Sequence, residues 1–176
     1  VLANGSLSSQ SGGEGTIREN ILKADLVECI VAMPSQLFYS TQIPVCLWFL
    51  NRAKKQPGKV LFIDARNMGS MVTRKLRELP EEDIMKIAGT YDAYVAGTLE
   101  DEKGYCAVVG MDEIEKQDYI LTPGRYVGIT ETEDDDEPFQ EKMERLTGEL
   151  SELFAKSHEL EAEIKKQLAS IGFTIK

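Results

Sequence analysis

The chain has 176 residues, 42% of them hydrophobic, and carries a formal net charge of −10. This apolar content is enough for a sizeable core, but no apolar run reaches the roughly 18 to 20 residues of a membrane-spanning helix. The sequence therefore predicts no membrane-spanning helix, and no signal peptide is visible. The acidic balance also disfavours tight DNA binding by this chain alone, because affinity for nucleic acids is built largely from phosphate contacts.

The residues that could hold a metal ion are scattered along the chain. Cys29, Cys46 and Cys106 lie far apart without a Cys-x-x-Cys pair, which argues against both a zinc site and a disulfide framework. We expect no metal and interpret the three cysteines as buried, reduced thiols of a cytoplasmic protein. His158 is the single histidine and lies in a charged stretch, so histidine-based catalysis has little support.

The N-terminal third has the pattern of an α/β sheet. Residues 1–3 are expected to end a strand, and a Ser/Gly-rich loop follows. Thr16 and Glu19 form a capping box, which predicts a helix that starts at Thr16. Residues 26–33 and 43–50 are almost continuously apolar, as in strands that are covered on both faces. Residues 60–63 predict a further short strand.

The middle of the chain is less regular, and residues 68–79 are ambiguous. Pro80 is expected at the first position of a helix that Gly97 ends. Residues 105–109 predict a strand, and Asp112 is expected to cap a short helical turn. The predicted buried face of the helix after Pro80 consists of Ile84, Ile87, Ala88, Tyr91 and Val95.

The last part of the chain predicts an exposed linker and a long helix. Residues 131–137 are almost all acidic and cannot pack in a core. After them, apolar residues at alternating steps of four and three predict a coiled-coil helix of roughly 50 Å, with Gly172 as its C-cap. Such a helix needs a partner, although it could also fold back on its own domain or pair with a second copy. The candidate residues for contact with another subunit are Met143, Leu146, Leu150, Leu153, Leu160 and Ile164.

Several stretches, in order, resemble one protein family. They are LVECIVAMP at residues 26–34, QLFYSTQIP at 36–44, VCLWFL at 45–50, VLFIDAR at 60–66 and DYILTPGRYV at 118–127. Together they resemble the modification (M) subunit of type I restriction–modification systems. Members of that family are adenine-N6 DNA methyltransferases, which move a methyl group from S-adenosylmethionine to an adenine that is flipped out of the duplex.

The resemblance implies an architecture and its division along the chain. The fold class is α/β: the C-terminal part of a Rossmann-like methyltransferase sheet with an antiparallel edge hairpin, followed by a coiled-coil-like helical tail. We expect residues 1–66 to belong to the methyltransferase domain and residues 67–130 to form a mixed helical and irregular extension. The acidic linker at 131–137 would then lead to a helical tail at 138–176 that contacts another subunit.

Two motifs that carry the family's chemistry are missing from this sequence. The Asn/Asp-Pro-Pro-aromatic tetrapeptide is absent, since no two of the six prolines are adjacent. The glycine cluster at residues 12–15 follows a Ser-rich loop instead of the first strand that precedes the family's cofactor loop. We therefore expect the catalytic residues upstream of Val1. The fragment is expected to bind no cofactor and to be inactive by itself, while the parent protein uses S-adenosylmethionine.

The resemblance also implies a site in the loop between the two apolar strands. A flipped base needs aromatic or apolar walls and a few polar contacts. The candidate residues for this pocket are Phe38, Tyr39, Thr41 and Pro44. The alternative for Phe38 is a packed hairpin loop with its ring in the core.

The expected partners are the specificity (S) subunit, with the restriction (R) subunit as a further one, and DNA bound through the whole complex. Self-association of the fragment through an open sheet edge is a further expectation. The main alternative function is a non-enzymatic interaction module that docks a partner through its C-terminal helix. A single-chain methyltransferase with a fused recognition domain is a third possibility, which the helical tail disfavours.

Overall fold

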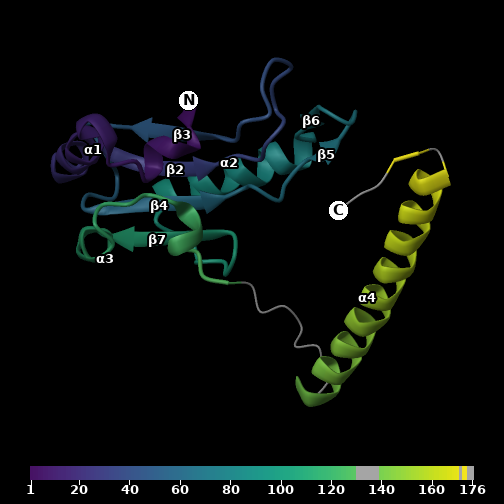
Figure 1. The fold of residues 1–176 in the computed structure, drawn as a ribbon. Helices are drawn as coiled ribbons and strands as arrows, with labels where there is room; N and C mark the ends of the chain where they lie inside the picture. The colour runs from purple at the N-terminus through teal and green to yellow at the C-terminus, as the bar shows by residue number, and fades with distance from the viewer. Residues whose placement is uncertain (130–138, 171, 174–176) are drawn as a thin grey trace. The chain divides into compact units, whose positions relative to one another are not determined.

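The computed structural model describes residues 1–129, 139–170 and 172–173. The chain divides into two compact units, Val1–Thr130 and Glu131–Lys176 (Figure 1). The acidic linker that was predicted at residues 131–137 lies outside the described residues. The first unit contains a sheet and its covering helices, and the described part of the second is one long helix.

Five strands form the main sheet of the first unit, in the order β1-β3-β2-β4-β7. Strand β3 pairs antiparallel with both β1 and β2, β4 pairs parallel with β2, and β7 pairs antiparallel with β4. Strands β1, β2 and β4 therefore run in one direction. The strand bounds are Leu2–Ala3 (β1), Val27–Ala32 (β2), Val45–Leu50 (β3), Lys59–Asp64 (β4) and Cys106–Gly110 (β7).

The predicted antiparallel hairpin is confirmed, with Ile30 opposite Trp48 and Ala32 opposite Cys46. The predicted strand near residues 60–63 is also confirmed as β4. However, the sheet continues past the hairpin, because β4 and β7 follow β2 on its other side. The hairpin therefore lies inside the sheet instead of at its edge. Residues expected to form an extension share this sheet, since β7 comes from the segment after residue 66.

The sheet is covered on both faces, which explains the continuous apolar runs. One face carries Ile30 and Phe62 and packs against Leu22 of α1 (Glu14–Lys23) and Ile114 of α3 (Met111–Lys116). The other face carries Val31 and packs against α2 (Glu81–Ala96). Alternating side chains of β2 and β4 thus enter different cores, as strand geometry requires. All three cysteines are free and buried, as predicted.

The predicted starts of two helices were wrong. Helix α1 begins at Glu14 with Gly13 as its N-cap, not at Thr16, and α3 is capped by Gly110 and not by Asp112. Neither helix has a side-chain cap. Left-handed Gly13, with φ of +82°, lets the preceding 3-10 turns (η1, Asn4–Leu7; η2, Ser11–Gly13) run directly into α1. A Thr-x-x-Glu spacing therefore occurs here inside a helix.

Helix α2 differs from its prediction in its first residue and in which side chains it buries. Pro80 is its N-cap, so the helix begins at Glu81, one residue later than expected, and Gly97 ends it with φ of +75° as predicted. Ile84 and Ala88 are exposed, whereas Tyr94 is fully buried. The hydroxyl of Tyr94 donates a hydrogen bond to the backbone oxygen of Lys59, so a residue at the end of the helix fixes it against the sheet.

The ambiguous stretch before α2 forms a second, two-stranded sheet. Strands β5 (Ser70–Met71) and β6 (Arg77–Glu78) pair antiparallel, with Met71 opposite Arg77. After β7 and α3, the unit ends in a short 3-10 turn, η3 (Pro123–Arg125). Its neighbour Tyr126 stacks on Phe62, with ring centroids 4.2 Å apart.

The long helix of the second unit, α4, spans Phe139–Ser170, and its 32 residues agree with the predicted length. Gly172 has φ of +87°, its amide donates to the oxygen of Ala169, and the amide of Phe173 donates to that of Leu168. This pattern is a Schellman C-cap, as predicted. No helix in the described part of the chain is long and apolar enough to cross a membrane.

Candidate functional site

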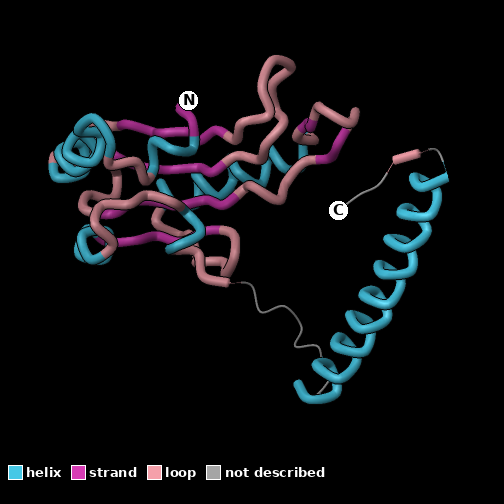
Figure 2. The backbone as a smooth tube through the Cα atoms, viewed as in Figure 1, coloured by secondary structure: helices cyan, strands magenta, loops and turns pink. Residues whose placement is uncertain are grey.

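The carboxyl ends of β1, β2 and β4 meet at one edge of the sheet, at Ala3, Ala32 and Asp64. In open α/β sheets ligands bind outside this edge. Two segments extend from it: the loop at residues 33–44 and the β5–β6 hairpin (Figure 2). This edge is therefore the place to look for a functional site.

The loop at residues 33–44 is held by backbone hydrogen bonds at its two ends and at Gln36. The amide of Met33 donates to the oxygen of Val45 at 2.9 Å, and the amide of Asn4 donates to the oxygen of Pro44 at 3.2 Å. The amide of Arg77, in β6, donates to the oxygen of Gln36 at 2.8 Å. The loop is thus joined to the end of β1 on one side and to the β5–β6 hairpin on the other.

The structure separates the four predicted pocket residues into two groups. Phe38 and Thr41 line a shallow hollow with residues 1–3, and its volume is about 340 Å³. Tyr39 and Pro44 do not line it, and Tyr39 is 93% exposed. Phe38 is 42% exposed, so its ring is not part of the core. The oxygen of the Thr41 hydroxyl accepts the amide of Ile43 at 3.2 Å, which leaves its O–H free to donate.

The charges at the end of β4 compensate one another. The carboxylate of Asp64 accepts two hydrogen bonds from Nε of Arg66, at 2.8 and 3.1 Å, and one from Nη2 at 2.6 Å. This hydrogen-bonded carboxylate raises the pKa of Arg66. Arg66 therefore adds little net positive charge to the edge.

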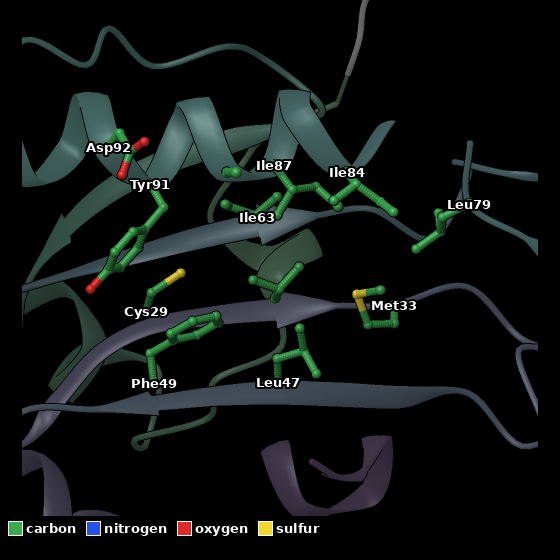
Figure 3. Close-up of a pocket in the computed structure, with 12 residues that line it drawn as sticks. Cys29, Met33, Leu47, Phe49, Ile63, Leu79, Ile84, Ile87, Tyr91 and Asp92 are labelled. Atoms are coloured by element: carbon green, nitrogen blue, oxygen red, sulfur yellow. The ribbon is translucent and has the colours of Figure 1, made fainter. Parts of the chain in front are cut away.

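A second hollow, of about 300 Å³, lies between α2 and the sheet. Figure 3 shows Ile87 and Tyr91 of α2 facing Phe49 and Leu47 of β3, with Met33 just after the end of β2. Asp92 is its one charged lining residue, and the Tyr91 hydroxyl is already bonded to Glu28 at 2.7 Å. Converging polar groups, which a catalytic or small-molecule site needs, are absent from this lining.

Glu28 is a buried carboxylate that the sequence analysis did not single out. It is 2% exposed and accepts hydrogen bonds from Nδ2 of Asn51, at 3.1 and 3.2 Å, as well as from Tyr91. Burial, together with the hydrogen bond to Glu28, raises the pKa of Tyr91 to about 12. Because this cluster lies near the start of β2, away from the carboxyl edge, we assign it to packing.

The glycines at residues 12–15 do not fit a cofactor loop. A Cβ atom on Gly12 or Gly13 would have nothing within 4 Å, so these residues form no close cradle. A Cβ atom on Gly15 would meet the Gln10 side chain and no open site. The described residues also contain no group of three side chains that could hold a metal ion. No cofactor site is assigned to this chain.

The arrangement of the sheet is that of a methyltransferase subunit. The structure is similar to the methyltransferase subunit of a type I restriction–modification system from Streptococcus thermophilus, with a TM-score of 0.60 and 27% identity. The likeness covers 71% of this chain and 25% of the other. This similarity agrees with the predicted fold class.

The sequence comparison gives the family. Residues 1–135 match the family model described as N-6 DNA Methylase, and the chain belongs to this family. The chain is 56% identical over 174 residues to the type I restriction enzyme HindI methylase subunit of Haemophilus influenzae. It is 43% identical over 178 residues to the MjaIX methylase subunit of Methanocaldococcus jannaschii. Each match covers 98% of this chain, but the chain spans 39% and 32% of the length of these relatives.

Proposed function

We propose that this chain forms the adenine-facing part of the modification subunit of a type I restriction–modification enzyme. That enzyme transfers a methyl group from S-adenosylmethionine to the N6 atom of adenine in DNA. The observation that carries the proposal is the position of Phe38 and Tyr39, two exposed aromatic rings on a loop held at the carboxyl edge. The names of the similar methylase subunits support the reaction.

The loop has the chemistry that a flipped adenine requires. The exposed rings of Phe38 and Tyr39 offer faces for stacking, and the Thr41 hydroxyl can donate to the base edge. Pro44 fixes the end of the loop through its bond with Asn4. The cofactor supplies the methyl group when it is bound by the longer protein, so residues of this chain are assigned to substrate binding alone.

The experiment uses the full-length methylase subunit assembled with its specificity subunit. Because stacking contributes about 1–3 kcal/mol per base, Tyr39→Ala should lower kcat/KM for DNA by about tenfold to a hundredfold. Tyr39→Phe keeps the ring and should stay near wild type. The fluorescence of 2-aminopurine at the target position measures flipping directly and should fall in Tyr39→Ala.

Binding of S-adenosylmethionine serves as the control and should be the same in both Tyr39 variants. Unchanged methylation and unchanged fluorescence in Tyr39→Ala and in Phe38→Ala would remove the loop from the site. In that case the interaction module, in which the sheet is a scaffold for α4, becomes the better reading of this chain.

The partner proposal rests on α4. None of the described residues of this helix is buried, and Leu146, Leu150 and Leu153 are 43–64% exposed. An apolar seam on a long polar helix is stabilised by a second helix. We assign the seam to the specificity subunit, which brings the DNA target to the complex, and a restriction subunit is a further partner of that assembly.

A further inference from the structure

The β5–β6 hairpin carries two basic side chains at its tip, Arg74 and Lys75. Both are exposed, and neither forms an ion pair within the described residues. Some other basic residues of this unit are paired, for example Arg66 with Asp64 and Lys54 with Asp25. An exposed and uncompensated basic pair is notable in a chain with a net charge of −10, because it offers binding sites for an anion.

The hairpin is fixed to the substrate-facing edge of the sheet. Besides the bond from the amide of Arg77 to Gln36, Nε2 of Gln36 donates to the oxygen of Arg74 at 3.4 Å. Nη1 of Arg77 donates to the oxygens of Met68 and Gly69, each at 2.9 Å. Gln36 belongs to the loop that bears Phe38 and Tyr39, so the basic tip and the aromatic rings are parts of one connected structure.

The turn at the tip is defined by its own hydrogen bonds. The oxygen of the Thr73 hydroxyl accepts the amides of Lys75 and Leu76, at 3.2 and 3.1 Å. The amide of Val72 donates to the oxygen of Leu76, whose side chain is 9% exposed and anchors the turn. The backbone under the two basic residues is therefore ordered before any ligand arrives, which lowers the entropy cost of binding.

Neither of the nearby acidic residues, Asp83 and Glu78, forms an ion pair with Arg74 or Lys75. Asp83, at the start of α2, accepts the amide of Gly69 at 2.7 Å. Glu78 lies at the base of the hairpin, opposite Ser70, whereas Arg74 and Lys75 lie at its far end.

We propose that Arg74 and Lys75 bind backbone phosphates of the DNA strand beside the flipped adenine. This inference rests on the proposed function of the loop at residues 33–44. Phosphates are the matching ligand because they repeat along the strand next to the extruded base, and Arg and Lys bind them without regard to sequence. The hairpin thus holds the DNA in register, while the specificity subunit selects the sequence.

The test measures DNA affinity of the full methylase subunit in complex with its specificity subunit, as a function of salt concentration. Each phosphate contact contributes about 0.9 to the slope of log affinity against log salt. Arg74→Ala with Lys75→Ala should therefore lower the slope by about 2, and Lys75→Gln alone by about 1. Affinity should fall by the same factor for target and non-target DNA, since phosphate contacts carry no sequence information.

A matched control is available at the end of the main sheet that lies opposite its carboxyl edge. Arg52 and Lys55 are also exposed and lie in the loop after β3, so Arg52→Ala with Lys55→Ala should leave the slope unchanged. Exchanging the two residues, Arg74→Lys with Lys75→Arg, keeps both positive charges. This variant should keep the wild-type slope and would show that the hairpin tolerates substitution.

An unchanged slope in the alanine pair would overturn the proposal, as would a loss of affinity confined to the target sequence. The proposed function is judged separately, by methyl transfer in the wild-type complex. If the wild-type complex methylates adenine and the slope is unchanged, the hairpin proposal fails alone. If the wild-type complex transfers no methyl group but the slope falls in the alanine pair, the phosphate contacts are supported and the proposed reaction is wrong.

Discussion

Glu28 is a charged residue within an apolar strand, and local pairing explains how the fold accommodates it. Val27 pairs with Leu50 and Cys29 with Phe49, so Glu28 is the extra residue of a β-bulge. A bulge re-aims a side chain, and this one brings the carboxylate to Asn51 and Tyr91. A buried carboxylate is stable when its oxygens accept hydrogen bonds, which makes Tyr91 and Asn51 necessary neighbours.

This arrangement predicts a loss of stability in alkali. The pKa of Tyr91 is raised to about 12 by burial and by Glu28, whereas a tyrosine in the unfolded chain titrates near 10. Below about pH 10 Tyr91 is neutral in both states, and between about 10 and 12 the unfolded state ionises first, so stability falls as pH rises. Tyr91→Phe should weaken this fall and cost about 1–3 kcal/mol at neutral pH, because Glu28 loses a donor.

Urea unfolding of the chain at several pH values between neutral and about pH 11 measures both effects. Tyr94 and Tyr126 also have raised pKa values because they are buried, so the variant removes part of the alkaline loss. Tyr39→Phe, at an exposed ring, is the control and should match wild type. A parallel pH dependence in Tyr91→Phe and wild type would contradict the assignment.

For single residues, the sequence indicates a role where the residue belongs to a recognisable stretch. It gives no sign of a role that depends on contacts with residues far along the chain. Phe38 and Tyr39 were singled out because they lie in a stretch with family resemblance, and both rings are exposed. Arg18, in contrast, is 2% exposed because its guanidinium donates to the oxygens of Tyr119, Ser6 and Ser9. Tyr119 is far along the chain from Arg18, and no pattern around residue 18 indicates that contact.

Among helices and strands, too, those with a long sequence signal were predicted, and those that depend on distant contacts were not. The two apolar runs and the periodic seam of α4 are long signals, and these elements were predicted with nearly their final bounds. The orientation of α2 was missed in part because Tyr94 is buried through a bond to Lys59 of β4, while Ile84 faces an open hollow. The β5–β6 hairpin was missed because each strand has two residues, too few for any periodicity.

The seam of α4 allows a direct test at this scale. Replacing Leu150 and Leu153 by Asp puts two charges in the proposed helix interface. Burial of each leucine side chain there would contribute about 1.5–3 kcal/mol, so affinity for the specificity subunit should fall at least about a hundredfold. Ser151→Asp with Ala155→Asp adds the same charges on the other side of the helix and should bind normally. Affinity measured by calorimetry distinguishes them, and equal binding by both double variants would exclude the seam as the interface.

For the first unit as a whole, the edge strand β1 determines which part of the proposed site this chain contains. Strand β1 has two residues, pairs with β3, and has no neighbour on its other side among the described strands. Residues 1–3 line the hollow that holds Phe38 and Thr41. One wall of the proposed adenine site is therefore present, and the glycines at residues 12–15 form no cradle for a cofactor: Gly12 and Gly13 have nothing near them, and Gly15 lies against the Gln10 side chain.

If the proposed function is right, the residues that face the adenine and those that bind the cofactor lie in different parts of the longer methylase subunit. Calorimetry with S-adenosylmethionine should give no saturable heat with the isolated 176-residue chain, whereas the longer methylase subunit should bind it. Thermal unfolding gives a second readout, since a ligand that binds the folded state raises Tm, and no rise is expected for the isolated chain. Saturable binding would place the cofactor within this chain, and the loop with Phe38 and Tyr39 would then have to be reconsidered as a cofactor contact instead of a wall for adenine.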